Sequence, residues 1–341
     1  MFLIRSAEPR DFSAVFRLSR LLDSYNLPAD RGFVRGLLKD SAASFSGRAL
    51  PAEKRRFLFV AEDLQSRNVV GCSLVIARHG TKKLPHIAFR VERQRKRSRP
   101  LGRSVTHQTL ELTVNRSGYT EIGGLALLSG YRRLPERLAI QLSYVRFAFM
   151  AWNPNRFCRR VLVEYLPKLE ANGGNQFWRA LGARFTHLSY READRLSVSN
   201  KEFILSLFPE EKIDCDLLPK SVVRDLGIPG PGARTSLHML EKIGFRYLNQ
   251  VDPFDGGPHY SALLRAISVV RSTRFFRFQW EIHRSIKQNK RALILALKHG
   301  AARAVVSDYE TKQNTIQLPT ATARALALKD GERISVTPIE R

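Results

Sequence analysis

The stretch EIGGLALLSGYRRLPERLAIQLSYVRFAFM, residues 121 to 150, joins three different patterns within thirty residues. A short apolar segment comes first and is typical of a strand. A tight turn follows, and beyond it the apolar residues recur at the spacing of an amphipathic helix. The stretch therefore predicts a strand, a turn and a long helix in immediate succession.

The elements around this stretch follow a mixed order. Residues 1–6 predict a strand, and apolar residues from Phe12 to Leu22 predict a helix. RRFLFVAED and NVVGCSLVIARHG predict two strands joined by a polar turn at 65–68, and HQTLELTVN and RRVLVEYL are further strands. The helices in NQFWRALGARF and LHMLEKIGFRY are expected to end at left-handed glycines, Gly182 and Gly244. This order predicts a mixed α/β sheet rather than a doubly wound parallel one.

Composition limits the classes of protein that the chain can represent. Its 341 residues are 43% hydrophobic, which is enough for two or three packed domains. No run of about 18 apolar residues predicts a membrane span, and the start MFLIRSAEPRDF turns charged too early for a signal peptide. Cys72, Cys158 and Cys215 lie far apart without a CxxC pair. They predict reduced thiols in a cytoplasmic protein, with neither a disulfide framework nor a metal site.

The charge balance is strongly basic. Lys and Arg number 57 against 31 Asp and Glu, a formal net charge of +26. Three explanations stay open: nucleic-acid binding, binding of a small polyanion such as a CoA thioester, and a solvated basic surface. The densest run, FRVERQRKRSRPLGR at 89–103, lacks interleaved stacking aromatics. It is therefore a poor single-strand platform, and we expect a solvated loop or edge strand.

A strand, a turn and a helix can hold the pyrophosphate of an acyl-CoA on backbone N–H groups at the helix start. GNAT-type acyltransferases do so with a turn of the form R/Q-x-x-G-x-G/A, in which glycine allows close approach. This chain has Pro135 and Arg137 at the glycine positions, and proline has no N–H to donate. The alternative is an ordinary strand-turn-helix with Pro135 at the helix start.

A larger set of segments carries a resemblance to a known family. DxFDGGP at 252–258 is the most specific segment, and FWxxLG at 177–182 is the next. In order and spacing, the set resembles the arginine N-succinyltransferase family over nearly the whole chain, tail included. Its other members are YNLPAD, YTEIGGLALLSGYRR, VRFAFMA, READRL, NKEFILSLFP and LEKIGFRYLNQ.

The resemblance implies a tandem of GNAT-like domains with a small C-terminal β module. The expected ranges are 1–190 for an acyl-CoA-binding domain, 191–275 for a second GNAT-like half and 285–341 for the β module. The family moves a succinyl group from succinyl-CoA to the α-amino group of arginine, or in some members ornithine, in arginine breakdown. Its succinyl-CoA contact falls on the backbone of Leu125, and Ala126 and Leu127 adjoin it.

Departures from the family pattern shift the expected roles. The family's proton-donor His, in a V-H-P-x-T loop, falls on Gly230 here. We expect His238 to supply the proton instead, with His259 as a second candidate. Arg132, Arg133 and Arg137 are expected to pair with the phosphates. Glu121 and Asp255 are expected to hold the cationic substrate, and no metal is expected.

A second hypothesis comes from a different class. A chain without the donor His and the glycine turn could be a non-catalytic descendant, acting as a binding or hetero-oligomer subunit. Its basic surface could then contact nucleic acid. For the enzyme, the expected partners are succinyl-CoA and a basic amino acid in a cytoplasmic homo- or hetero-oligomer. The expected mechanism is direct attack without an acyl-enzyme, because no Cys or Ser has an identifiable base.

Overall fold

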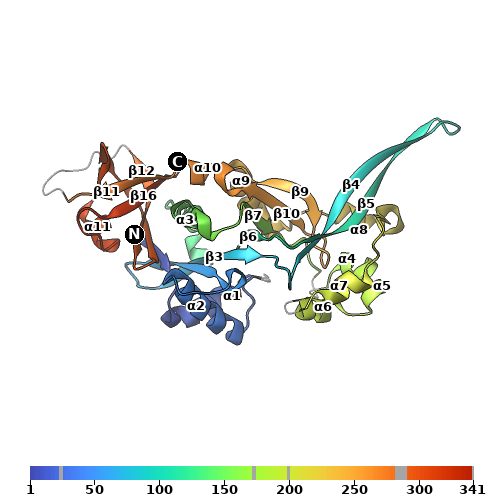
Figure 1. Ribbon diagram of the computed structural model, residues 1–341, viewed down its shortest axis with the longest axis horizontal. Helices are drawn as coiled ribbons and strands as arrows, with labels where there is room; N and C mark the ends of the chain where they lie inside the picture. Colours follow the sequence, from blue (N-terminus) through green and yellow to red (C-terminus); the bar gives the residue numbers. More distant parts are fainter. Residues whose placement is uncertain (23–25, 171–173, 198–199, 281–289, 340–341) are drawn as a thin grey trace. The chain divides into compact units, whose positions relative to one another are not determined.

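The computed structural model describes residues 1–22, 26–170, 174–197, 200–280 and 290–339 (Figure 1). The chain forms two compact units. Unit 1 comprises Met1–Arg78, Thr120–Val161 and Leu263–Arg341, and unit 2 comprises His79–Tyr119 and Leu162–Ala262. The ends of these units do not coincide with the expected domain ranges 1–190, 191–275 and 285–341.

The sheet of unit 1 has the strand order β14-β15-β11-β16-β12-β13-β1-β2-β3-β6. Most of its pairings are antiparallel, but β11 and β15 run parallel, so the predicted mixed α/β class is confirmed. The strands are β1 (Phe2–Ser6), β2 (Arg56–Asp63), β3 (Val69–His79), β6 (Tyr119–Leu127), β11 (Arg274–Phe278), β12 (Arg291–Lys298), β13 (Ala301–Asp308), β14 (Glu310–Lys312), β15 (Thr315–Gln317) and β16 (Arg333–Pro338).

The C-terminal strands join the N-terminal strand. β13 pairs with β1 so that Ile4 lies opposite Ala304, and β12 pairs with both β13 and β16. Leu3 packs into the same buried cluster as Phe278 and Ile294. The tail does form β-strands, but the apolar face of their sheet is completed by a strand from the other end of the chain. This shared core is why the tail falls within unit 1.

Helix α3 (Leu138–Trp152) fills the centre of unit 1. Phe147 and Phe149 are fully buried, and the Phe149 ring lies 5.0 to 5.6 Å from Phe45, Phe57 and Phe59. Each buried ring stabilises the fold by about 1.5–3 kcal/mol, so these contacts anchor the C-terminal half of α3 in the core. The other helices are α1 (Phe12–Ser19), α2 (Arg31–Phe45), α10 (Ser268–Ser272) and α11 (Thr320–Ala325).

The sheet of unit 2 has the order β7-β10-β9-β4-β5-β8, with its helices gathered in one stretch of chain. Across both units, none of the described helices is long and apolar enough to cross a membrane. The elements are β4 (His86–Ser98), β5 (Arg103–Asn115), β7 (Arg160–Glu164), α4 (Gln176–Ala180), α5 (Gly182–Thr186), α6 (Tyr190–Ser197), α7 (Glu202–Leu207), β8 (Ile213–Asp214), α8 (Lys220–Asp225), α9 (Arg234–Lys242), β9 (Arg246–Val251) and β10 (Pro258–Leu263).

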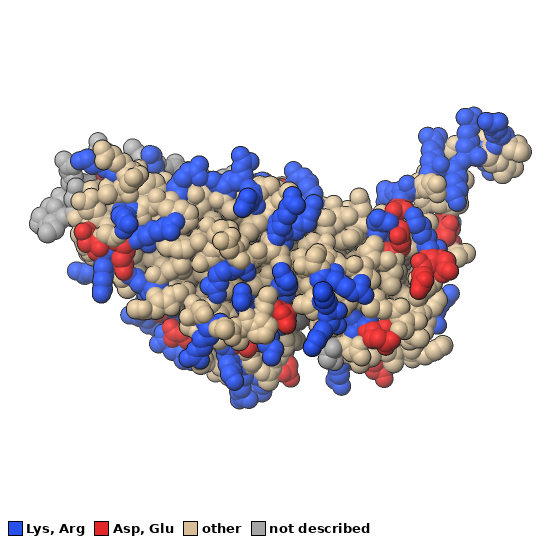
Figure 2. All heavy atoms as spheres, in the orientation of Figure 1, with Lys and Arg blue, Asp and Glu red and all other residues tan. Residues whose placement is uncertain are grey.

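The basic run at 89–103 forms most of β4 and the turn of a long hairpin. β4 and β5 pair from His86 opposite Asn115 to Ser98 opposite Arg103. β9 joins β4 only at Phe89 and Arg90, so the outer part extends as a two-stranded arm (Figure 1). Lys and Arg side chains cover the arm (Figure 2). Phe89 is buried, but most of the run beyond Val91 is exposed. Of the two expected forms, a solvated loop and an edge strand, the run takes that of a strand.

The two helix-ending glycines differ. Gly244 has φ +112° and follows α9, so its predicted left-handed cap is confirmed. The prediction for Gly182 is wrong, because Gly182 is the first residue of α5. A Cβ there would lie 2.3 Å from the Trp178 ring. Close packing against an indole, and not backbone handedness, therefore requires glycine at this position.

Candidate active site

The predicted strand-turn-helix is present in unit 1 as β6, the cradle turn (residues 129–137) and α3. Ala126 and Leu127 are buried at the end of β6, and Leu125 is half-buried. Gly124 has φ +56° in the interior of the strand, a conformation that marks a local irregularity in the ladder. The sequence therefore placed the cradle correctly, but it did not single out this glycine.

The helix begins later than a proline start would require. Its first residue is Leu138 and its N-cap is Arg137, so Pro135 lies in the turn and the alternative of Pro135 at the helix start is wrong. Arg137 has φ +53° and ψ +48°, the left-handed region. The backbone thus keeps a conformation that glycine adopts without strain, although the residue is an arginine.

The cradle turn presents cations to solvent. Arg132, Arg133 and Arg137 are all exposed, and Arg132 Nε donates to Leu127 O at 3.0 Å, closing the turn onto the strand. The first bond of the helix runs from Ile140 N to Arg137 O at 2.9 Å. The N–H groups of Leu138 and Ala139 therefore have no acceptor within the helix. Arginines beside such a helix start form a site suited to an anion.

Glu121 lies on β6, close to the cradle. It is only 1% exposed, and its Oε1 accepts a hydrogen bond from Asn26 Nδ2 at 2.7 Å. Asn26 belongs to the YNLPAD segment. A Cβ at Gly123 would lie 2.6 Å from the same amide nitrogen. The sequence identified Glu121 but missed Asn26 as its partner.

The loop that carries the family's proton donor is tightly packed at Gly230 in unit 2. Its N–H donates to Leu166 O at 2.9 Å, and a Cβ would meet Pro167 O at 2.9 Å. A side chain there requires the loop to move, so a histidine at position 230 does not fit this backbone. His238 lies on α9 and is exposed to solvent.

Asp255 is a buried turn residue. Its Oδ1 accepts from Gly257 N at 2.6 Å, and it is 4% exposed. Burial, and then the charge of Asp252, raise the pKa of Asp255 well above its ordinary value. Burial also raises the pKa of Asp252 to about 6. Because its Oδ1 is already held by the backbone of the same turn, the geometry favours a turn role for Asp255.

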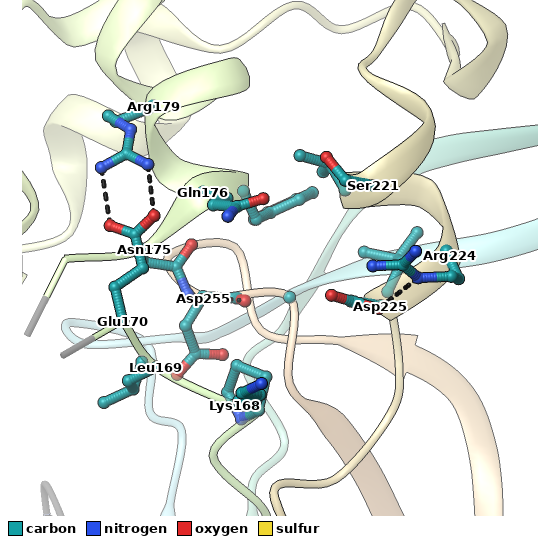
Figure 3. A pocket seen from close by; sticks show the side chains of 15 residues that line it. Lys168, Leu169, Glu170, Asn175, Gln176, Arg179, Ser221, Arg224, Asp225 and Asp255 are labelled. Atoms are coloured by element: carbon teal, nitrogen blue, oxygen red, sulfur yellow. Dashed lines mark hydrogen bonds and ion pairs between the residues drawn. The ribbon is translucent and has the colours of Figure 1, made fainter.

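A pocket of about 760 Å³ opens in unit 2 beside Asp255 (Figure 3). Two of its carboxylates are already paired with arginines of the same pocket. Glu170 accepts two hydrogen bonds from Arg179, at 2.5 and 2.7 Å, and Asp225 accepts one from Arg224 at 3.0 Å. These pairs neutralise the two carboxylates, and none of the described cradle residues lines the pocket.

A histidine cluster, formed by His79, His86 and His259 around Glu164, lies in unit 2. Glu164 Oε1 is 3.3 Å from His86 Nδ1, 3.8 Å from His79 Nε2 and 3.9 Å from His259 Nε2. Burial lowers the pKa of His259 to about 4 and also lowers that of His86. Burial alone would raise the pKa of Glu164, but the histidines outweigh it and hold that pKa well below its ordinary value.

The sequence named only His259 of this cluster. The four residues come from the end of β3, the start of β4, the end of β7 and from β10. No local pattern linked these residues, because His79 ends a predicted strand and His86 lies in a stretch for which no strand was predicted.

Comparisons with known proteins agree with this architecture. A family model described as "Arginine N-succinyltransferase beta subunit" matches residues 2–269. "Arginine N-succinyltransferase subunit alpha" of Pseudomonas aeruginosa is 29% identical over 99% of this chain and 100% of its own length. "Arginine N-succinyltransferase" of Citrobacter koseri is 30% identical over 80% of this chain and 79% of its own. The solved structure of arginine/ornithine succinyltransferase subunit AI from Pseudomonas aeruginosa has a TM-score of 0.82 at 27% identity, over 100% of this chain and 99% of that one.

Proposed function

This chain belongs to the arginine N-succinyltransferase family, and from that premise we propose that it transfers a succinyl group from succinyl-CoA to the α-amino group of arginine or ornithine. The match over residues 2–269 carries the proposal, because it spans the cradle, the donor-loop position and the DGGP turn together. A place in arginine breakdown and a cytoplasmic location belong to the same proposal.

The cradle turn supports binding of the cofactor. Leu138 and Ala139 offer backbone N–H groups at the start of α3, and Arg132, Arg133 and Arg137 add positive charge beside them. The pyrophosphate of succinyl-CoA would accept from these groups, while the backbone of Leu125 to Leu127 meets the acyl arm. In this proposal the arginines bind the phosphates, which in the family are bound by the N–H groups of the glycine turn.

The amine substrate needs a carboxylate near the cradle strand. Glu121 meets this need better than Asp255, because it lies on β6 and its Oε1 is already oriented by Asn26. The raised pKa of Asp255 argues against an ionic role for that residue. In this proposal Glu121 holds the cationic end of the amino acid, and Asp255 shapes the DGGP turn.

The transfer is a direct attack. The free amine adds to the thioester carbonyl, the C–S bond breaks, and CoA leaves as a thiolate. One proton leaves the attacking nitrogen and one reaches the thiolate sulfur, so a single positioned imidazole can serve both steps. His238 is the proposed group, since it is exposed on α9, the helix that follows the Gly230 loop in the chain.

Thiol release from a panel of acyl-CoAs with arginine and ornithine tests the proposal. We expect succinyl-CoA to react and the rate to rise with pH as the substrate amine loses its proton. His238→Ala should lower the rate well beyond tenfold, since proton transfer contributes roughly 100- to 10,000-fold. His187→Asn is the matched control, because His187 is also exposed and asparagine tolerates its left-handed backbone.

If no acyl-CoA and amine pair reacts, the second hypothesis of a non-catalytic subunit replaces this one. The word "subunit" in the names of two relatives supports an oligomer for this chain, homo- or hetero-oligomeric. None of the relatives reported above is named for nucleic acid. Retention on DNA or RNA that falls steeply with log salt would revive that explanation of the +26 charge.

A further inference from the structure

The histidine cluster places ligand-type side chains in two overlapping groups in unit 2, one of His79, His86 and Glu164 and one of Glu164, Asp252 and His259. Glu164 Oε1 lies within 3.3 to 3.9 Å of a ring nitrogen from each of His79, His86 and His259. The chain positions that meet here are up to 180 residues apart, 79 against 259. The proposed succinyl transfer uses none of these side chains.

The cluster leaves buried nitrogens without hydrogen-bond partners. His259 is 0% exposed and neither of its ring nitrogens has a hydrogen-bond partner among the described residues, nor has Nε2 of His86, which is 3% exposed. Burying an unsatisfied polar atom costs about 1–3 kcal/mol. Of these three nitrogens, Nε2 of His259 is the one that faces Glu164, since His86 turns its Nδ1 towards the carboxylate. The His259 nitrogen therefore calls for an additional bonding partner at this point.

We propose that His79, His86, His259 and Glu164 bind a divalent transition-metal ion of the Zn²⁺ type. Imidazole nitrogens with one carboxylate oxygen form a donor set that suits zinc. Two ligands at roughly 2.0–2.1 Å from a tetrahedral ion lie about 3.4 Å apart. The observed separations of 3.3, 3.8 and 3.9 Å from Glu164 Oε1 exceed this value by no more than about half an ångström. His259 must in addition move towards His79 and His86, because the ligand atoms within 4.8 Å of one another are those of His79, His86 and Glu164 and, separately, those of Glu164, Asp252 and His259.

Asp252 has a supporting role. It lies with Glu164 and His259 in a second group of ligand-type atoms. Its Oδ1 already accepts from the backbone N–H of Phe254 at 2.8 Å and of Asp255 at 3.2 Å. We assign it to orienting the ligands from outside the coordination sphere, a position where substitution typically weakens metal affinity about 10- to 100-fold.

The expected consequence is stabilisation of unit 2. The ion would join the end of β3, the start of β4, β7 and β10 through side chains, in addition to the backbone pairing. The prediction of no metal rested on cysteine spacing, which carries no information about histidines on separate strands. This proposal is independent of succinyl transfer, because it stands whether or not the chain is an active enzyme.

Metal binding to the full chain tests the proposal directly. The purified protein is stripped with a chelator, equilibrated with Zn²⁺, dialysed and analysed by elemental mass spectrometry. We expect one Zn²⁺ to be retained per chain and the melting temperature to rise with added Zn²⁺. Co²⁺ should give the intense visible absorption of a four-coordinate site. Absence of both retained Zn²⁺ and a Co²⁺ spectrum in the wild-type chain overturns the proposal without the need for a variant.

Three variants assign the ligands. Glu164→Gln keeps the side-chain volume and should abolish retention, as should His259→Asn. His107→Ala is the matched control, because His107 also lies between two carboxylates but is hydrogen-bonded at 2.7 Å to Asp216 near the surface. It should retain Zn²⁺ at the wild-type level. Equal loss in the control, or full retention by both cluster variants, would place the ion elsewhere and overturn the assignment.

Discussion

The cradle turn and the histidine cluster both concentrate titratable side chains, but they differ in their access to water. The three arginines of the turn are exposed, so their mutual repulsion is screened and an anion can approach them from solvent. In the cluster, His259 and His86 are buried, and their interactions act at a low local dielectric constant. An exposed site should therefore respond to salt and ligand, whereas a buried one should respond to the loss of any member.

The largest effect is expected from removal of the carboxylate at the centre of the cluster. In the presence of a chelator, Glu164→Leu should lower the free energy of unfolding by about 2–3 kcal/mol, because His86 Nδ1 loses its acceptor inside the protein. Urea denaturation measures the change, with Glu164→Gln as the milder comparison. A loss below about 0.5 kcal/mol would mean that the cluster behaves like an exposed site.

A smaller effect, visible only as a function of pH, is expected at Asp255. Its folded pKa is raised, so its contribution to stability is fully present below the pKa of an unfolded aspartate, near 3.9, and is lost as pH rises through the folded value. Asp255→Asn cannot titrate and keeps an oxygen for Gly257 N. The stability of the variant relative to wild type should therefore increase with pH above about 4. Urea denaturation at several pH values measures the free energies of unfolding of variant and wild type. If Asp255 were ionised in the folded protein, the difference between them would not change with pH.

The cradle turn should show a more modest effect on ligand binding. Arg137→Ala should weaken CoA binding at least several-fold at low salt, and added salt should reduce the difference. Arg137→Gly removes the same guanidinium but relieves the left-handed backbone, so it should be more stable than Arg137→Ala by about 1 kcal/mol. Calorimetry measures the CoA affinity, and thermal unfolding measures the stability difference between the two variants. A CoA affinity that changes neither with salt nor with substitution of Arg137 would show that the arginines do not bind the phosphates.

The smallest effect is expected at His107. Its partners Asp214 and Asp216 are 36% and 61% exposed in their side chains, so the ion pairs are strongly screened. His107→Ala should change the free energy of unfolding by no more than about 0.5 kcal/mol. If His107→Ala lowered the free energy of unfolding as much as Glu164→Leu, burial would not explain the difference between the exposed and the buried sites.

Local patterns accounted for the elements of the cradle but not for the convergence of side chains. The spacing in 121–150 predicted β6 and α3 because each is decided by residues close in sequence. Gly182 was misjudged, since the Trp178 ring and not the local chain requires it. The histidine cluster depends on the strand order β7-β10-β9-β4, and no local pattern specifies which strands become neighbours.

The pairing of β1 with β13 has a consequence for the order of folding. Residues 4 and 304 lie opposite each other, and a ribosome adds roughly 5–20 residues per second. The first strand therefore waits on the order of 15 to 60 seconds for its neighbour during synthesis. All of unit 2 has been synthesised by residue 262, before the last segment of unit 1 begins at residue 263. Unit 2 can therefore fold as an insert while the edge of β1 is still unpaired, and that edge is the surface that needs protection from aggregation in the nascent chain.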